Sequence, residues 1–186
     1  MTAVEQDRPL PPKKERDPIA DALEMMVYGL YIIGSHKGSE VNGMMADWVM
    51  QVSFRPRLVL VALERDARTL ENVRATGAFS VNMLGTEDAD VELARKFAQP
   101  YYAAKVEGRP EDEAQRVYRK LEGIPYSRGR TGCPILDDAV AWLECEAEQE
   151  VAVGDHILVI GRVVDGGVRR YGPILSSEVT GWTYSG

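Results

Sequence analysis

The segment from Val41 to Pro56 contains the residues of this chain best suited to bind a ligand through the backbone. It begins near Asn42-Gly43, a pair that tolerates positive φ and predicts a tight turn between strands. Pro56 lacks an N–H and predicts where the next strand starts, just before the apolar run from Leu58 to Leu63. The pattern predicts two strands joined by irregular backbone with exposed N–H groups, which suits a flat ligand with polar edges.

The usual motifs of nucleotide, metal and hydrolytic sites are missing from the sequence. No G-x-G-x-x-G follows an expected strand, and Gly34 to Ser39 lacks the spacing of a phosphate-binding P-loop. The two histidines, His36 and His156, stand far apart without a D-x-D-x-D or H-E-x-x-H pattern, so no metal is expected. There is also no G-x-S-x-G nucleophile motif. A bound organic cofactor is then the simplest source of reactivity.

Composition excludes several classes of protein. A chain of 186 residues, 45% hydrophobic and 27% charged, fits one globular domain with a real core. The formal charge of −7 argues against nucleic acid as a partner, and no apolar stretch is long enough for a membrane helix. Two cysteines are too few for a disulfide framework, and no signal peptide is expected, so the predicted location is cytoplasmic. Residues 1–17 are proline-rich and charged, which predicts a flexible arm before a domain over 18–186.

Hydrophobic periodicity predicts a mainly β protein with short helices. Strands follow one another without a helix between most of them, which favours antiparallel pairing in a small closed or split barrel. Residues 99–133 form a polar excursion that would act as a lid or a dimer arm, with a charged helix over 111–122. The expected strands are 27–35, 43–52, 57–63, 78–84, 139–147, 157–164 and a short one at 167–171, and the expected helices begin at Pro18 and cover 69–76 and 88–98.

Several segments together resemble a known family. They are Asn42 to Trp48 with Gln51 to Val59, then Thr69 to Arg74 with Gly77 to Leu84, then Leu93 to Ala98, and finally Pro134 to Val163 with its Gly154-Asp155-His156 turn. Their order, over roughly residues 20–165, resembles the flavin reductase-like, FMN-binding split-barrel family.

The resemblance implies a homodimer of six-stranded antiparallel Greek-key barrels, each subunit holding one flavin near the dimer interface. It implies FMN, with FAD as second choice, and transfer of reducing equivalents from NADH or NADPH to flavin. The implied enzyme is an NAD(P)H-dependent flavin reductase, alone or as the reductase component of an oxygenase system. The alternatives are a non-catalytic FMN-binding electron carrier or sensor, and a barrel that holds no flavin.

The resemblance also implies the site residues. His156 would lie near the nicotinamide as the catalytic candidate. Met45 replaces the usual Thr, and Asp47 replaces the usual Ser or Thr, where a carboxylate would repel a phosphate unless Arg65 or Arg68 screened it. The implied cofactor-binding residues are Asn42, Gly43, Met44, Met45, Ala46, Asp47, Trp48, Ser53, Phe54, Arg55, Arg65, Arg68 and Thr69.

Each of these features also has a purely structural interpretation. The 42–48 segment could be an ordinary hairpin strand, the arginines surface charges, Thr69 a plain helix cap and His156 a packed turn residue. His36 is expected in solvent and Cys145 in the core, while Cys133 beside Gly132 and Pro134 leaves a reactive thiol open. The aromatic residues of the 181–184 segment would cover a partner subunit or the flavin edge, or simply hold the C-terminus in place.

Overall fold

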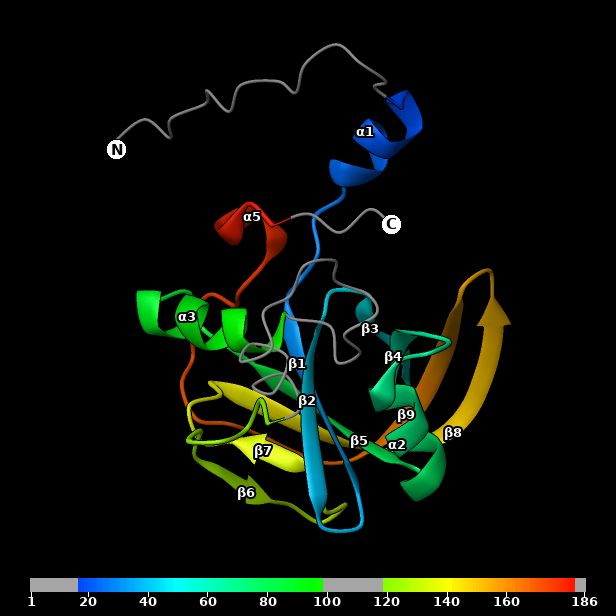
Figure 1. The fold of residues 1–186 in the computed structure, drawn as a ribbon, viewed down its shortest axis with the longest axis vertical. Helices are drawn as coiled ribbons and strands as arrows, with labels where there is room; N and C mark the ends of the chain where they lie inside the picture. The colour runs from blue at the N-terminus through cyan, green and yellow to red at the C-terminus, as the bar shows by residue number, and fades with distance from the viewer. Residues whose placement is uncertain (1–16, 99–118, 183–186) are drawn as a thin grey trace.

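A seven-stranded antiparallel sheet dominates the computed structural model, which describes residues 17–98 and 119–182 (Figure 1). Its strand order is β2-β1-β5-β8-β9-β4-β3, and β6 and β7 form a separate pair. The elements are α1 (Pro18–Glu24), β1 (Tyr31–Lys37), β2 (Glu40–Ala46), β3 (Val49–Phe54), β4 (Arg57–Glu64), α2 (Arg68–Thr76), β5 (Ala78–Met83), α3 (Asp88–Phe97), β6 (Tyr126–Arg128), β7 (Pro134–Leu136), β8 (Ala141–Val153), β9 (His156–Val168) and α5 (Ser177–Thr180).

The sheet curls because its two edge strands are neighbours in the sequence. β2 and β3 stand at opposite ends of the strand order, yet only Asp47 and Trp48 connect them. Two residues span too little distance to cross a flat seven-stranded sheet, so the edges must approach each other. The backbone N–H of Ala62 in β4 donates to the carbonyl of Trp48, and β2 also contacts β4. The result is a barrel that is split beside β2.

Two hydrophobic clusters hold the barrel together. Inside it, alternate residues of β4 such as Val59, Val61 and Leu63 pack against Leu70 and Val73 of α2. The second cluster lies on the other side of β1 and includes side chains of α3 and of residues 121–139. β1 serves both clusters because Ile33 points into the barrel and Ile32 into the second core. Burial on both faces makes β1 the central support of β2.

The strand count and one turn differ from the sequence expectations. The expected strand over 43–52 is two strands, β2 and β3, because the chain changes partner at Asp47, and the main sheet has seven strands where the resemblance implies six. The short strand expected at 167–171 is wrong, since those residues begin as the end of β9. The structure confirms the predicted fold class, a mainly β split barrel.

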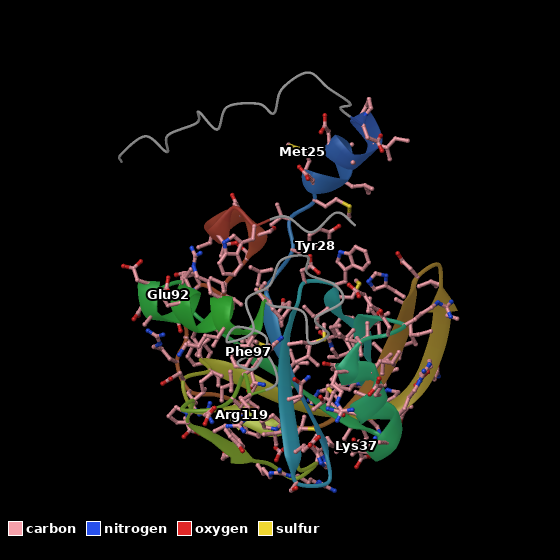
Figure 2. The ribbon with its side chains drawn as sticks, in the orientation of Figure 1. Met25, Tyr28, Lys37, Glu92, Phe97 and Arg119 are labelled. Carbon is pink, nitrogen blue, oxygen red and sulfur yellow. The ribbon has the colours of Figure 1, made fainter. Side chains whose placement is uncertain are left out.

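Asn42-Gly43 does not form a turn, so that prediction was wrong. Both residues lie inside β2, and the turn falls at Gly38, which has φ +59°. Gly43 is needed for a different reason, because a Cβ there would lie 2.6 Å from the Phe97 ring. The aromatic side chain therefore packs directly on the strand backbone, and Figure 2 labels this Phe97 between α3 and the barrel.

Two further expectations also need correction. Residues 119–133 are not a wholly polar excursion, because Leu121 and Ile124 join the second core and β6 pairs with β7. His36 is not simply solvated, since its Nε2 lies 3.1 Å from the carbonyl of Thr131. The helix expected over 111–122 lies mostly outside the described residues, as does nearly all of the expected arm over 1–17.

The helix predicted at Pro18 is present as α1, but it has no buried residue. Its side chains, near the label of Met25, stand away from the barrel (Figure 2). In the parts of the chain that the structure describes, no helix has the length and apolar character needed to cross a bilayer.

Candidate functional site

The outer edge of β2 presents backbone groups to a ligand. Within the described residues β2 pairs in the sheet only with β1, so alternate N–H and C=O groups on its other edge point away from the sheet. The side chains of Met44 and Ala46 pack in the barrel core, and that of Met45 packs in the second core. A ligand at this edge would therefore meet the backbone of these three residues, so a methionine at 45 need not disturb it.

The first turn of α2 lies beside this edge. Its N-cap residue, Ala67, has no side chain that can accept a hydrogen bond, so this residue gives the first N–H groups of α2 no side-chain cap. The buried hydroxyl of Thr69 accepts a hydrogen bond from Asn42 Nδ2 at 3.1 Å, which ties β2 to the helix. Arg68 is held by Glu40 at 3.0 Å and Glu71 at 2.9 Å. This arrangement of N–H groups, hydroxyl and guanidinium is suited to an anion such as a phosphate.

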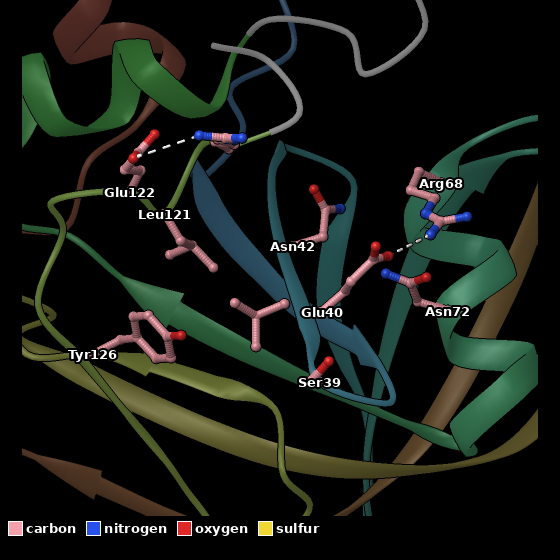
Figure 3. A pocket seen from close by; sticks show the side chains of 10 residues that line it. Ser39, Glu40, Asn42, Arg68, Asn72, Leu121, Glu122 and Tyr126 are labelled. Atoms are coloured by element: carbon pink, nitrogen blue, oxygen red, sulfur yellow. Dashed lines mark hydrogen bonds and ion pairs between the residues drawn. The ribbon is translucent and has the colours of Figure 1, made fainter. Parts of the chain in front are cut away.

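A pocket of about 490 Å³ adjoins this helix start (Figure 3). Asn72, three residues after Thr69 on the same face of α2, lines it while being only 2% exposed. Asn72 Nδ2 donates to Ser35 Oγ, whereas Asn72 Oδ1 has no hydrogen-bond partner among the described residues. The lining residues are Ser39, Glu40, Val41, Asn42, Arg68, Asn72, Arg119, Leu121, Glu122 and Tyr126.

His156 lies at the other end of β2, where the chain passes to β3. Its ring packs on Trp48 with the two ring centroids 4.8 Å apart and tilted by 47°. His156 Nδ1 is 2.6 Å from Asp155 Oδ1, and that contact lowers the pKa of the Asp155 carboxyl. His156 is buried, so its ring is oriented by both neighbours. The structure thus brings His156 and Trp48 together at the end of the open edge.

Asp47 stands at the same corner. Burial raises the pKa of its carboxyl, and this effect is opposed by hydrogen bonds from the backbone N–H groups of Asp47 and Trp48 and by the nearby His156. The carboxyl therefore occupies two backbone N–H donors, which are then not free for a ligand. A residue with an uncharged side chain at 47 would leave the corner less negative.

Replacing Asp47 with Asn is expected to stabilise the protein at neutral pH. Because the raised pKa means that the folded state binds the proton more tightly than the unfolded chain, the wild type loses stability as pH rises from the ordinary Asp range through the raised pKa. The gain for Asp47→Asn should be at most about 1 kcal/mol, since solvent still screens this group. Urea unfolding at pH 3 and pH 7 measures it, and a gain that is equal at both pH values would contradict the account.

Four of the predicted residues lie elsewhere. Arg65 Nε donates to the carbonyl of Gly154 at 3.0 Å, so its side chain braces the turn before His156. Ser53 and Phe54 end β3 and Arg55 lies in the turn that follows, at the far end of β4 from Glu64, which pairs with His156. At roughly 3.3 Å per residue this separation along β4 is about 20 Å. Within one chain, these three residues do not join the other candidates.

The remaining side chains give little reactivity. Burial raises the pKa of Cys133 to about 11 and that of Cys145 to about 12, so neither thiol is a ready nucleophile.

The ring of Trp182 stacks under Arg95 of α3 at 5.2 Å, which favours the interpretation that it holds the C-terminal segment to its own chain. Sequence reasoning missed Asn72, although a polar residue on the buried face of a short helix was an available signal.

The fold is that of a curled antiparallel split barrel whose open edge strand, β2, lies beside the start of α2. Residues 23–175 match the model of the Flavin reductase like domain family. The chain therefore belongs to this family, and the family predicted from the sequence is confirmed.

Individual relatives agree with this family. A Rhizobium meliloti protein named "Probable flavin reductase" is 32% identical over 78% of this chain, and the match spans 41% of that longer relative. An Archaeoglobus fulgidus ferric-chelate reductase (NAD(P)H) is 29% identical over 84% of this chain and 85% of its own length. The solved styrene monooxygenase flavin reductase of Pseudomonas putida S12 is 25% identical, with a TM-score of 0.66 over 86% of this chain and 91% of that one. These names agree with the expected NAD(P)H-dependent flavin reductase.

Proposed function

We propose that this protein is an NAD(P)H-dependent flavin reductase that binds FMN, or FAD as second choice, along the open edge of β2. The observation that carries the proposal is that this edge runs from the start of α2 to the Trp48–His156 pair. A flavin has a ring system with polar edges and, in its nucleotide forms, a phosphate. An edge of backbone N–H groups that ends at an anion seat suits both parts of that molecule.

The residues at the helix start fit the phosphate. Arg68 supplies a guanidinium, Thr69 supplies a hydroxyl, and the first turn of α2 supplies N–H groups. We infer that Arg65, Ser53, Phe54 and Arg55 contribute less to the flavin of their own chain, because their side chains lie away from this seat.

When bound, flavin would supply the acceptance of hydride from NAD(P)H and the onward transfer of two electrons. The protein would orient the reactants and exclude water. Backbone N–H groups of residues 44–48 would stabilise negative charge that develops on the ring. His156, oriented by Asp155 and Trp48, would form the wall against which the nicotinamide is placed. No acid or nucleophile from a side chain is then required.

The names of two relatives support the proposal of particular electron acceptors for this protein. One relative is a ferric-chelate reductase and another is the flavin reductase of a styrene monooxygenase. We propose that this protein likewise passes electrons to free flavin, a ferric chelate or a partner oxygenase. A cytoplasmic location and a single domain over 18–186 after an N-terminal arm are part of the same proposal.

Titration of FMN into the purified protein, followed by assay of NADH and NADPH oxidation, tests the function. Quenching of FMN fluorescence and oxidation well above that of free FMN in buffer are expected. Quenching without faster oxidation would point instead to a carrier or sensor. Unchanged FMN fluorescence would contradict any flavin site.

We propose that the protein acts as a homodimer, because β4 and β9 are apolar on both faces. Their inner residues fill the barrel, while Leu58 and Leu60 of β4 and Leu158 and Ile160 of β9 alternate to the outer face and remain half-exposed. Met50 pairs with Leu60 and is 61% exposed. A sheet that is apolar on both faces normally has a layer on each side. A second copy would supply that layer through a self-complementary contact.

Replacing Leu60 with Glu is expected to convert the dimer to a monomer, because two charges would be buried at the contact. Size-exclusion chromatography with light scattering measures the mass. The matched control is Val168→Glu, an exposed position near the other end of β9 that should leave the dimer intact. A wild-type protein that is monomeric at micromolar concentration would overturn the proposal.

A further inference from the structure

The hydrogen bond between His156 and Asp155 fixes which ring nitrogen of His156 carries a proton. His156 Nδ1 lies 2.6 Å from Asp155 Oδ1, and that contact lowers the pKa of the Asp155 carboxyl. An ionised carboxylate has no proton to donate, so the proton in this hydrogen bond belongs to Nδ1. A neutral imidazole carries a single N–H, which leaves Nε2 of the neutral ring as a hydrogen-bond acceptor.

Nε2 of His156 is open to a ligand although most of the ring is buried. Only 10% of the His156 side chain is exposed, and the ring packs on Trp48. Nε2 has no hydrogen-bond partner among the described residues, and the atom keeps accessible surface of its own. A ligand that lies along the β2 edge would therefore meet this acceptor at the corner where β2 passes to β3.

Arg65 holds the turn that carries Asp155. Its Nε donates to the carbonyl of Gly154 at 3.0 Å, and its backbone N–H donates to the carbonyl of Asp155 at 3.2 Å. Gly154 and Asp155 are the two residues between β8 and β9, so Arg65 bonds to the whole turn. The Asp155 carboxylate is 91% exposed, and a side chain in solvent is weakly held by one ion pair. The two hydrogen bonds from Arg65 keep the backbone of Asp155 in place, and with it the carboxylate beside Nδ1.

We propose that Asp155 and Arg65 are positioning residues that present Nε2 of His156 to the nicotinamide as a hydrogen-bond acceptor. The carboxamide of nicotinamide has an amine that donates to such an acceptor. A hydrogen bond there would fix the direction of the carboxamide and hold the ring in one orientation for hydride transfer. The inference rests on the proposed flavin reductase function. It assigns Arg65 to the nicotinamide end of the site, whereas the family resemblance implies a contact with the flavin.

The tautomer of His156 is measured on the protein without any cofactor. The chain has two histidines, so ¹⁵N NMR of histidine-labelled protein shows two rings, and His36→Gln assigns them. At a pH where both rings are neutral, His156 is expected to carry its proton on Nδ1. Asp155→Asn keeps an accepting oxygen and should preserve this tautomer, whereas Asp155→Ala should move the proton to Nε2. A wild-type ring protonated on Nε2 would overturn the inference.

A substrate analogue tests what Nε2 does. Reduced 3-acetylpyridine adenine dinucleotide donates hydride but lacks the amide amine. The wild type should prefer NADH over this analogue in kcat/KM, and Asp155→Ala should reduce that preference about tenfold. Asp155→Asn should keep the preference within about threefold of the wild type. An unchanged preference in Asp155→Ala would overturn the role of Nε2.

The matched control is Asp165→Ala. Asp165 is an exposed residue near the other end of β9, and its carboxylate also bonds to the next residue, through the N–H of Gly166 at 2.8 Å. Its removal should leave both the tautomer of His156 and the preference for NADH unchanged. Circular dichroism and thermal unfolding check that all variants fold.

Arg65→Ala separates the two roles open to that residue. If Arg65 holds the turn, the variant should lose part of the preference for NADH, with FMN affinity within about threefold of the wild type. A tenfold loss of FMN affinity with an unchanged preference would place Arg65 at the phosphate and overturn its positioning role. The proposed function fails separately, if the wild type binds no FMN or oxidises no NADH. The tautomer in the cofactor-free protein then still decides whether Asp155 positions the ring.

Discussion

Thr69→Val is expected to weaken FMN binding at least tenfold, which is about 1.4 kcal/mol. Valine keeps the shape of threonine but removes the hydroxyl that receives Asn42 Nδ2 at 3.1 Å. The loss leaves a donor of Asn42 without its acceptor and takes one polar group from the phosphate seat. Fluorescence titration with FMN measures the affinity.

Two companion variants make this test specific. Thr69→Ser keeps the hydroxyl and should bind FMN within about threefold of the wild type. Arg65 and Thr69 are equally good candidates for the phosphate seat from the sequence, but in the structure the Arg65 guanidinium donates to the carbonyl of Gly154. Arg65→Ala should therefore weaken FMN binding less than Thr69→Val does. Equal affinity of Thr69→Val and the wild type would move the phosphate seat elsewhere.

Glu144→Ala is expected to lower the free energy of unfolding by roughly 3 kcal/mol or more. Glu144 is fully buried in β8, and its carboxylate accepts from the backbone N–H of Arg130 at 2.9 Å and of Thr131 at 2.7 Å, and from the hydroxyl of Thr131 at 2.6 Å. Removing the carboxylate leaves these donors unpaired beside a new cavity. The same loop holds His36, so the β1–β2 hairpin that borders the pocket should loosen as well.

Urea unfolding of the purified variants measures this loss. The control is Glu146→Ala, two residues along β8, whose half-exposed carboxylate pairs with Arg162. A surface pair of that kind contributes at most about 1 kcal/mol. If both alanine variants were equally stable, the buried carboxylate would not be the main attachment of the loop.

Local signals in the sequence predicted several elements well. α2 ends at Gly77, which takes the left-handed conformation with φ +70°, as a glycine after a helical pattern indicates. β4 begins directly after Pro56, and Gly154-Asp155 forms the turn between β8 and β9. These features depend on residues adjacent in the sequence, so the sequence alone was enough to place them.

Features that depend on distant residues were missed. Gly43 was interpreted as a turn residue because Asn-Gly usually forms turns, whereas its lack of a side chain accommodates Phe97. The expected strand over 43–52 is divided because the carbonyl of Trp48 accepts a hydrogen bond from Ala62 of β4. No local sequence pattern indicates this contact between distant residues. The pocket combines the β1–β2 hairpin, α2 and residues 119–126, which only the folded chain brings together. The sequence therefore located the open edge but not the pocket beside it.

A crystal structure of the protein grown with FMN tests the central claim most directly. We expect density for the phosphate against the first turn of α2, with Thr69 and Arg68 as its contacts, and the ring system along the main chain from Met44 to Trp48. Density for FMN at another surface, or a β2 edge that is covered by the protein's own chain, would contradict the account.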